Sequence, residues 1–373
     1  MGVRTGPSSQ WAGDRQIRYL LTSLFAYQQI VFVLKLVYSL VTHEENVLKI
    51  VLEGLMSASF FFAGLKVLSL VLFREQIANI RNFITSNRVN SCDKHYDQLE
   101  HNRFNQSVKT LLHVIFILII VNVVFLSVPN STTDSLLRMP PFMTMLGPNA
   151  THVLYFCFVK LMALGILPRY FSSMACIGTL LMGMRTNLRI LGHRYRQMLH
   201  QPNQTVEKYF ENLNHEVRTA LNQQLQYWSH LRTLKDLTGK SFFLVHYFAV
   251  CSVGTMLYVA KHLGMNFLAA AFLATCSVLI MEYFLWCHLV DSLQDEANYI
   301  GGVLFELCAR LRYSRTCHSQ HVRMRSSLLI TRMNTINGLS MNCLGLYKIS
   351  TEQFVEFMNT AYFMLMFLFN MSD

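Results

Sequence analysis

The sequence predicts an all-α membrane protein with seven transmembrane helices, a cytoplasmic N-terminus and an extracellular C-terminus. Three observations carry this prediction. Long apolar runs alternate with polar segments, positive charge gathers in alternate polar segments, and only four residues follow the apolar run 361–369. Of the 373 residues, 52% are hydrophobic and 14% are charged, whereas about 25% are charged in typical globular proteins. The composition therefore favours a membrane protein over a soluble one.

Seven apolar runs approach the length of about 20 residues that a helix needs to cross a bilayer. The fourth run is long and contains Pro168, which predicts a kink or an inner end outside the membrane. The whole chain, 1–373, is expected to form one seven-span domain with helical cytoplasmic extensions. The predicted spans are about 19–41, 47–73, 111–128, 153–181, 241–261, 267–287 and 351–370.

The distribution of Lys and Arg predicts the orientation of these spans. With the N-terminus inside, the segments on the inner side carry 25 Lys and Arg, and the segments on the outer side carry 2. Cytoplasmic loops of membrane proteins are enriched in these residues. The first span is then expected to act as the insertion signal, because the N-terminus lacks the pattern of a cleaved signal peptide.

Glycosylation sequons support the same orientation. Asn130 and Asn149 each begin an Asn-x-Ser/Thr sequon in the segment 129–152, which this orientation places outside, so both are expected to be glycosylated. The sequons at Asn105 and Asn203 fall inside and are expected to stay unmodified.

The two longest inner segments, 182–240 and 288–348, each carry an apolar residue at every third or fourth position. This spacing is typical of helices with one apolar stripe. Two interpretations remain open at this point. The stripes could pack on each other below the membrane, or they could form a contact between subunits.

Two charged residues stand out inside the predicted spans. Lys66 lies in the second span and Glu282 in the sixth. An ionisable residue inside the membrane is a candidate for function, usually with a partner. The alternative is a structural role, in which the residue is paired or reaches the inner membrane surface.

The sequence does not predict an enzyme, a cofactor or a metal site. It contains no Walker loop, Gly-x-Ser-x-Gly or His-Glu-x-x-His motif. The nine Cys residues include no Cys-x-x-Cys pair, and none lies in a segment predicted to be outside, so disulfides are not expected. The net charge is +11, but basic patches interleaved with aromatic residues are missing, so nucleic acid is not an expected partner.

A G-protein-coupled receptor is an obvious alternative with seven spans. Its orientation would be reversed, and its Asp/Glu-Arg-Tyr and Asn-Pro-x-x-Tyr motifs are absent from the third and last spans here. The predicted outer segments also contain no Cys for the usual disulfide bridge. This class is therefore the least favoured of those considered.

The last span resembles that of the insect odorant receptors. The family pattern is a Phe, then an Ala/Ser-Tyr pair, then a Leu six positions after the Tyr; here these are Phe354, Ala361-Tyr362 and Leu368. Three further segments are similar to parts of the family: GLYKIST (345–351), ACIGTLLMGMRTNLRILGHRYRQM (175–198) and PPFMTMLGP (140–148).

The departures from the family pattern separate its branches. Phe363 replaces the usual Ser after the Tyr, and Met366 lies where a Thr is frequent. The related gustatory receptors carry Thr-Tyr, five apolar residues, then Gln-Phe, and here Ala361 and Leu368 replace the Thr and the Gln. The inner segment 182–240 has 59 residues, which is too short for the odorant co-receptor. The chain therefore resembles a ligand-specific tuning receptor.

The resemblance implies a subunit of a ligand-gated cation channel, a tetramer built with the odorant co-receptor and opened by small volatile organic ligands. The expected location is the plasma membrane of olfactory sensory neuron dendrites. The alternative function is a gustatory-type channel that works without the co-receptor.

The resemblance also implies that the seventh helix lines the pore. At about 100° per residue, an apolar stripe runs along this helix, and a ring of such stripes can close a pore by dewetting. Glu352 and Glu356 would either form acidic rings at the inner mouth or face the cytosol. The predicted pore and gate residues are Leu368, Leu365, Ala361, Phe357 and Tyr362.

The ligand pocket is expected among the outer halves of the other spans, because small volatile ligands need an apolar cavity with few polar groups. The predicted lining residues, chosen by depth and composition, are Met56, Phe60, Phe125, Phe158, Met162 and Phe272.

Overall fold

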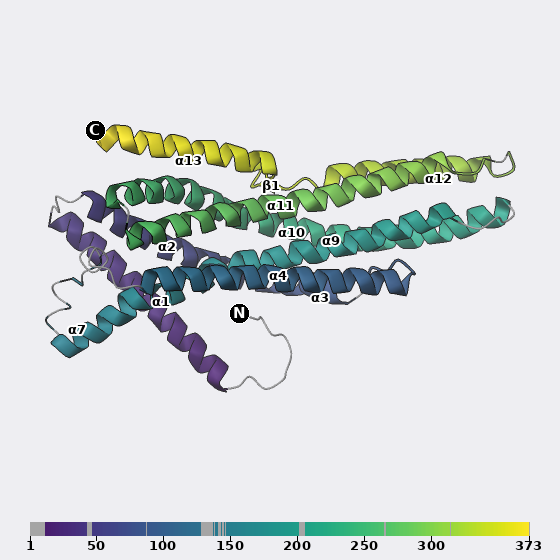
Figure 1. Cartoon of the computed structure of the whole chain (residues 1–373). Helices are drawn as coiled ribbons and strands as arrows, with labels where there is room; N and C mark the ends of the chain where they lie inside the picture. Colours follow the sequence, from purple (N-terminus) through teal and green to yellow (C-terminus); the bar gives the residue numbers. More distant parts are fainter. Residues whose placement is uncertain are drawn as a thin grey trace.

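The computed structural model of the chain is an elongated bundle of helices (Figure 1). The structure describes residues 12–372 except 43–46, 87, 128–136, 138, 141–142, 144, 146, 201–205, 265 and 314. Its elements are α1 (Ala12–Val41), α2 (Val47–Leu72), α3 (Arg74–Thr85), α4 (Lys94–Ser127), α7 (Pro148–Tyr155), the π-helical turn η1 (Phe156–Lys160), α8 (Met162–Tyr170), α9 (Ser172–Gln197), the 3₁₀ turn η2 (Met198–His200), α10 (Val206–Leu263), α11 (Phe267–Ala309), α12 (His318–Gly338), β1 (Asn342–Cys343), β2 (Tyr347–Lys348) and α13 (Thr351–Ser372).

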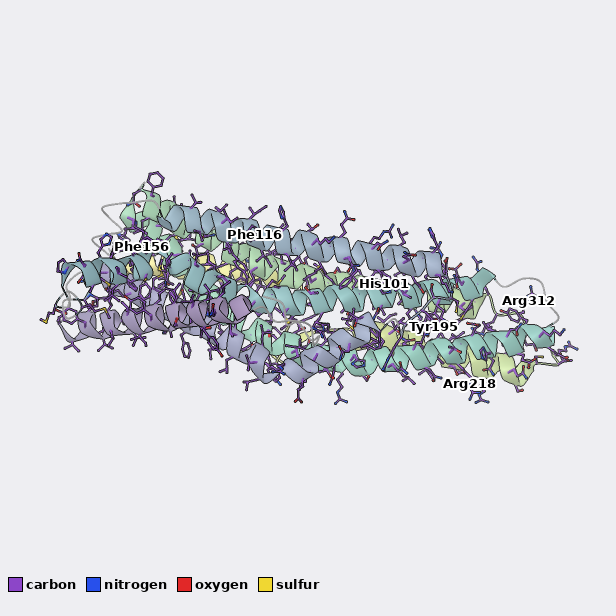
Figure 2. The ribbon with its side chains drawn as sticks, turned by 90° about the horizontal axis from the view of Figure 1, so that it is seen from below. His101, Phe116, Phe156, Tyr195, Arg218 and Arg312 are labelled. Carbon is purple, nitrogen blue, oxygen red and sulfur yellow. The ribbon has the colours of Figure 1, made fainter. Side chains whose placement is uncertain are left out.

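Long apolar segments appear where the sequence predicts spans. Within the described residues, six helical segments are long and apolar enough to cross a membrane, and they overlap the first six predicted spans. The seventh predicted span, 351–370, corresponds to α13. Apolar and basic side chains lie toward opposite ends of the molecule (Figure 2). Phe116 and Phe156, both about half exposed, lie toward one end, and Arg218 and Arg312 lie toward the other. Exposed aromatic side chains at one end suit contact with lipid tails.

The fourth span is interrupted twice. A π-helical turn, η1, separates α7 from α8, and Phe171 separates α8 from α9. A π turn leaves backbone groups without their usual helical partners, and here the amide of Gln28 on α1 donates to the Cys157 carbonyl oxygen over 2.8 Å. Pro168 lies inside α8. The break at Phe171 lies three residues after the proline and the break at η1 lies before it, and the kink itself stays a prediction.

The bundle continues beyond its membrane-spanning part. Figure 1 shows α9, α10, α11 and α12 running on together toward one end of the molecule, past the start of α13. The apolar stripes of α10 and α11 are buried there for most of their length: Leu213 and Leu304 are both 0% exposed. Leu225 is the exception, with 67% exposure. The interpretation that these stripes pack within the chain is therefore confirmed.

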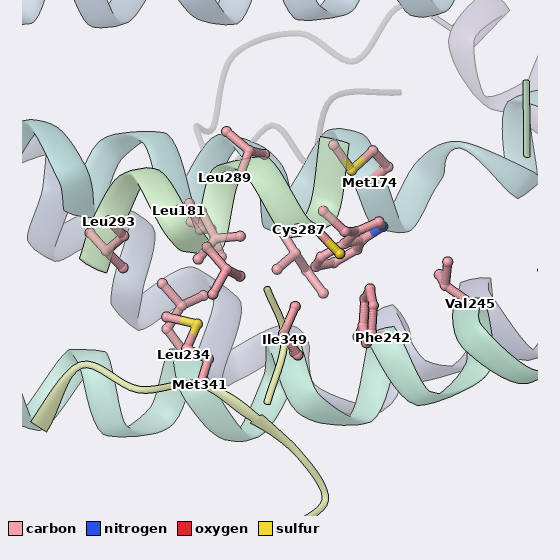
Figure 3. Packing of buried hydrophobic residues seen from close by; sticks show 14 of the residues in the cluster. Met174, Leu181, Leu234, Phe242, Val245, Cys287, Leu289, Leu293, Met341 and Ile349 are labelled. Carbon is pink, nitrogen blue, oxygen red and sulfur yellow. The ribbon is translucent and has the colours of Figure 1, made fainter. Parts of the chain in front are cut away.

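A small β-hairpin connects α12 to α13, near the middle of the molecule's length (Figure 1). Strands β1 and β2 are antiparallel, with Cys343 opposite Tyr347, and Gly345 in the turn has a φ of +80°. Figure 3 shows Met341 and Ile349, which flank the hairpin, next to core side chains of α10 and α11. The hairpin therefore fixes the direction in which α13 leaves the helical extension.

Candidate ligand cavity and pore helix

An apolar cavity lies among five helices of the membrane-spanning part, α2, α4, α8, α10 and α11. It leaves about 70 Å³ in which the centre of a water-sized sphere can move, whereas about 10–15 Å³ is enough for one water molecule. The space is therefore several times that needed for a single water. Its lining residues are Met56, Ser59, Phe60, Asn122, Met162, Ile166, Leu167, Tyr170, Phe248, Met256, Ala271, Phe272, Thr275, Val278 and Leu279.

Four of the six residues predicted from the sequence to line a pocket contribute to this one cavity. They are Met56, Phe60, Met162 and Phe272, from three different helices. Phe158 is buried, but it is not among the lining residues, and its ring packs on Phe32 with 4.6 Å between centroids. The side chain of the sixth residue, Phe125, lies outside the described part of the chain.

The polar side chains of the cavity wall were not predicted. Thr275 donates to the Ala271 carbonyl oxygen over 2.8 Å and lies 3.1 Å from the amide oxygen of Asn122. The Tyr170 hydroxyl is also buried, beside the Glu282 carboxylate. A single Thr or Asn in an apolar run forms no periodic pattern, so the sequence alone does not show that it lines a cavity.

Next to the cavity, Lys66 of α2 and Glu282 of α11 form a buried ion pair. The Lys66 amine lies 2.9 Å and 3.0 Å from the two carboxylate oxygens, and the exposed fractions of the two side chains are 1% and 0%. The amine also lies 3.4 Å from the centroid of the Tyr170 ring and 3.4 Å from the Tyr170 carbonyl oxygen. Burying each charge is costly, and the pairing offsets that cost. The structure thus supports the paired alternative for both residues, which are each other's partners.

A second intramembrane lysine is paired in the same way. The amine of Lys35 on α1 lies 3.4 Å from Glu53 of α2, and the Ser39 hydroxyl donates to the other Glu53 oxygen over 2.7 Å. This pair explains how a charged residue is accommodated in the first predicted span.

Aromatic residues join α11 to α13. The Tyr283 ring on α11 stacks on the Phe357 ring on α13, with 4.3 Å between centroids and 13° between planes. The Tyr283 hydroxyl is also hydrogen-bonded to Nδ1 of His246 on α10, at 2.8 Å. Tyr283 directly follows Glu282, so one turn of α11 contacts both the ion pair and α13.

The start of α13 is fixed by two polar contacts. The Ser350 hydroxyl accepts a hydrogen bond from the Gln353 amide at 3.4 Å and so caps the N-terminus of the helix. The Asp291 carboxylate of α11 accepts from the Thr351 amide at 2.7 Å. Both contacts satisfy backbone donors that a helix N-terminus leaves free.

The apolar stripe of α13 packs on the chain's own helices. Phe357 and Ala361 are 0% and 2% exposed, and α13 contacts mainly α10 and α11. In this conformation, these two predicted pore residues therefore face the protein interior. Leu365 is partly buried, Tyr362 is 58% exposed, and the side chain of Leu368 lies outside the described part.

The face of α13 opposite Phe357 and Ala361 is exposed, and it carries both apolar and polar side chains. Phe363 is 70% exposed, and Glu352, Glu356 and Asn359 are exposed on the same helix. The sequence pattern identified an apolar stripe but could not show which neighbour covers it.

Of the two sequons predicted to be outside, one can be placed. Asn149 is exposed in the first turn of α7, and Asn130 lies outside the described residues. Within the part of the chain that the structure describes, no group of three or more His, Cys, Asp or Glu residues is arranged to hold a metal ion.

Comparison with known proteins identifies the fold. No family model and no curated protein sequence matches the chain. Among solved structures, the insect olfactory receptor OR5 from Machilis hrabei aligns with a TM-score of 0.74 over 98% of this chain and 92% of its own length, at 12% identity. The chain has the fold of an insect olfactory receptor.

The same receptor solved in complex with eugenol gives a TM-score of 0.75 over 99% of this chain and 93% of that one, at 11% identity. The prediction of an all-α membrane protein of this kind is thereby confirmed. The alignment covers nearly the whole chain, so the likeness includes the continuations of α9, α10 and α11 beyond the apolar segments.

Proposed function

We propose that the chain is an odorant receptor subunit of a ligand-gated cation channel, assembled as a heterotetramer with the odorant co-receptor. The observation that carries the proposal is the olfactory-receptor fold over 98% of the chain. The apolar cavity gives that fold a place for a small organic ligand, and one of the matching structures contains the small organic molecule eugenol.

The ligand site of this proposal is the cavity among α2, α4, α8, α10 and α11. Its wall is almost entirely apolar, which suits volatile molecules with few polar groups. Met56, Phe60, Met162 and Phe272 are its proposed contact residues. Phe158 packs on Phe32, whose ring packs on the wall residue Phe60, so Phe158 supports the wall from behind.

The pore of this proposal is lined by α13. Its exposed face carries Glu352, Asn359 and Phe363, which lie within about 40° of one another at about 100° per residue. Carboxylates toward one end of the helix favour cations, and an apolar ring further along can close the pore. Tyr362 borders this face, whereas Phe357 and Ala361 hold the helix against its own subunit.

The proposed topology has the N-terminus in the cytoplasm and the C-terminus outside, in the plasma membrane of olfactory sensory neurons. The proposal is supported by the concentration of Lys and Arg in the inner segments. An N-terminal tag should then be accessible to antibody only after cells are permeabilised. Labelling of intact cells would overturn this orientation.

The central experiment is current recording from cells that express the chain with and without the co-receptor, against a panel of odorants. Ligand-evoked cation current that requires both subunits is the expected result. Current from this chain alone would instead favour the gustatory-type channel. No current from either combination, with both proteins at the cell surface, would overturn the channel proposal.

The proposed pore face has its own test. Phe363→Ser should change basal current or ion selectivity, because it puts a polar group on the exposed face of α13. Leu368→Ser, at the predicted gate, should raise basal current. The matched control is Phe116→Ser, which removes an exposed Phe from α4 (58% exposed). Equal effects of all three substitutions would overturn the assignment of α13.

A further inference from the structure

The short helix α8 forms one wall of the cavity. Four of its nine residues line the cavity: Met162, Ile166, Leu167 and Tyr170. The π turn η1 precedes this helix, and the break at Phe171 follows it. A helix this short has few backbone hydrogen bonds of its own, so its position depends on the helices that pack against it. The contacts behind α8 therefore determine the position of this wall.

Helix α1 supports the wall from outside the cavity. Within the described residues, none of the lining residues comes from α1. Arg169 of α8 donates a hydrogen bond to the Leu21 carbonyl oxygen of α1 over 2.7 Å, and its guanidinium lies 4.4 Å from the centroid of the Phe25 ring. The Phe25 ring in turn packs on the wall residue Phe60 of α2, with 5.3 Å between centroids. Helix α1 thus supports the wall at both α8 and α2.

The side chain of Gln28 on α1 packs directly on the backbone of α8 at Gly165. A Cβ atom added to Gly165 would overlap Oε1 of Gln28 and lie 3.0 Å from its Cδ, so only glycine leaves room for this side chain. Gln28 is 0% exposed, and its amide donates to the Cys157 carbonyl oxygen of η1 over 2.8 Å. The side chain is therefore held in place, and it fills the space that α8 would need in order to move toward α1 and widen the cavity.

We propose that Gln28 is a positioning residue for the ligand site: its side chain, packed against Gly165, limits how far α8 can move toward α1 and so sets the size of the largest ligand that the cavity accepts. This inference rests on the proposed function for the identity of the cavity as the ligand site. Gln28 acts through α8 and not by touching the ligand, because it is not among the residues that line the cavity. Ligand size is thus selected from behind the wall as well as by the wall itself.

The test measures the binding of benzene, propylbenzene and pentylbenzene, which differ only in the length of an apolar chain. Binding is followed by the thermal unfolding of the purified full-length protein over a range of probe concentrations. Each methylene that finds room in the cavity should raise the affinity about fourfold, and a methylene that finds no room should not. The readout is the ratio of the affinity for pentylbenzene to the affinity for benzene. Comparing this ratio between variants cancels the partition of the probes into detergent.

Two substitutions should shift this affinity ratio in opposite directions. Gln28→Ala removes the side chain behind α8, so the ratio should rise about fourfold, the gain for one more buried methylene. Gly165→Ala adds a Cβ that meets Gln28, moves α8 away from α1 and into the cavity, and should lower the ratio. Shifts in the same direction, or an unchanged ratio in both variants, would overturn the proposal. Gln28→Ala alone decides the test if Gly165→Ala does not fold, because an unchanged ratio in Gln28→Ala is sufficient to overturn it.

The double variant shows whether the two residues act through their contact. When Gln28→Ala is already present, the Cβ added by Gly165→Ala no longer meets the Gln28 amide, so it should change the affinity ratio by less than about twofold. Equal effects of Gly165→Ala with and without Gln28→Ala would overturn the proposal. Gly54→Ala on α2 is the matched control, since a Cβ added there would have no atom within 4 Å, and its ratio should stay at the wild-type value.

A wall substitution checks that the probes bind in this cavity. Ala271 of α11 is a buried lining residue. Ala271→Leu fills part of the cavity and should lower the affinity for all three probes. Unchanged affinity in this variant would place the probes elsewhere and would overturn the proposal.

The binding assay does not require the channel to open, so it separates this inference from the proposed function. Opposite shifts of the affinity ratio without any evoked current would leave this inference standing and would overturn the proposed channel function. Evoked current with the same ratio in the wild type and in both single variants would do the reverse.

Discussion

The ring of Tyr283 on α11 lies against the ring of Phe357 on α13, with 4.3 Å between the centroids and nearly parallel planes. Phe357 is completely buried, so this contact is part of what holds the last helix to the rest of the chain. Phe357→Ala should cost on the order of 3 kcal/mol of stability, because it leaves a cavity where the ring was. The measurement is the thermal midpoint of the purified protein.

Phe363→Ala is the control for that substitution. It removes the same side chain from the same helix, but from a position that is 70% exposed. Its thermal midpoint should change much less. Equal losses in the two variants would contradict the placement of α13 against α11.

Removing one charge of the Lys66–Glu282 pair should lower the stability of the protein more than removing both charges. Glu282→Gln leaves the buried Lys66 amine without a counter-charge, which typically costs about 3–5 kcal/mol. The double variant Lys66→Met/Glu282→Gln should regain much of that loss, because no unpaired charge remains. Thermal unfolding and the yield of protein at the cell surface report the difference.

The exposed pair between Lys240 and Asp236, 2.6 Å apart, is the control for the buried pair. Asp236→Asn should change stability by less than about 1 kcal/mol, since exposed ion pairs contribute little. If Glu282→Gln behaved like Asp236→Asn, the buried pair would not have the importance that its geometry indicates.

Gly254 marks a close approach of α10 and α13. A Cβ atom at this position would lie 2.9 Å from Cγ of Met364 and 3.0 Å from its Cβ, which is closer than side chains pack. Gly254→Val should therefore displace α13, lower the thermal midpoint and change basal current. Gly302→Ala on α11 is the control: a Cβ added there would have no atom within 4 Å, and alanine favours the helix by up to about 1 kcal/mol.

Acid should weaken the contact between α3 and α10. The His230 ring stacks on Phe83 with 4.3 Å between centroids, and burial, with a smaller effect of Arg88, lowers the pKa of His230 below its ordinary value of 6.5. The unfolded chain therefore takes up the proton at higher pH than the folded chain, so stability is lost as the pH falls from 6.5 toward the lowered pKa. His230→Gln should lose less thermal stability than the wild type when the pH is lowered through this range. The same loss in both would assign the acid sensitivity to other groups.

Glycosylation gives a direct test of the proposed orientation. Asn149 is exposed at the start of α7, so Asn149→Gln should reduce the mass removed by an N-glycosidase from protein made in insect cells. Asn105→Gln, in a sequon predicted to be inside, should not change it. A change with Asn105→Gln alone would reverse the topology.

The sequence predicted where the long apolar helices lie because the signals are local. Apolar runs of the right length can be read without knowing which segments are neighbours, and the first six predicted spans each overlap a long apolar helix of the structure. Pro168 predicted a kink in the fourth span, and a helix break lies three residues after it at Phe171, whereas the π turn at η1, which has no comparable residue signal, was not predicted.

The contacts between helices could not be predicted from the sequence, because they join residues that are far apart along the chain. Lys66 and Glu282 were each identified as unusual, but they are 216 positions apart, and neither segment contains a signal that predicts its partner. The same limit applies to α13: a helical wheel shows that Phe357 and Ala361 share a face, and only the position of α10 and α11 shows that this face is covered. Four of the six predicted pocket residues line one cavity because depth in the membrane and apolar character are themselves local properties.

Helix α10 is continuous over 58 residues, from Val206 to Leu263, which corresponds to a rod about 87 Å long at 1.5 Å per residue. The cavity touches this rod at Phe248 and Met256, close to one end. A tilt of about 5° around that region would move the far end at Val206 by about 6 Å. Small adjustments of the helices around the cavity are thus enlarged into displacements of the size of a side chain at the far end of α10.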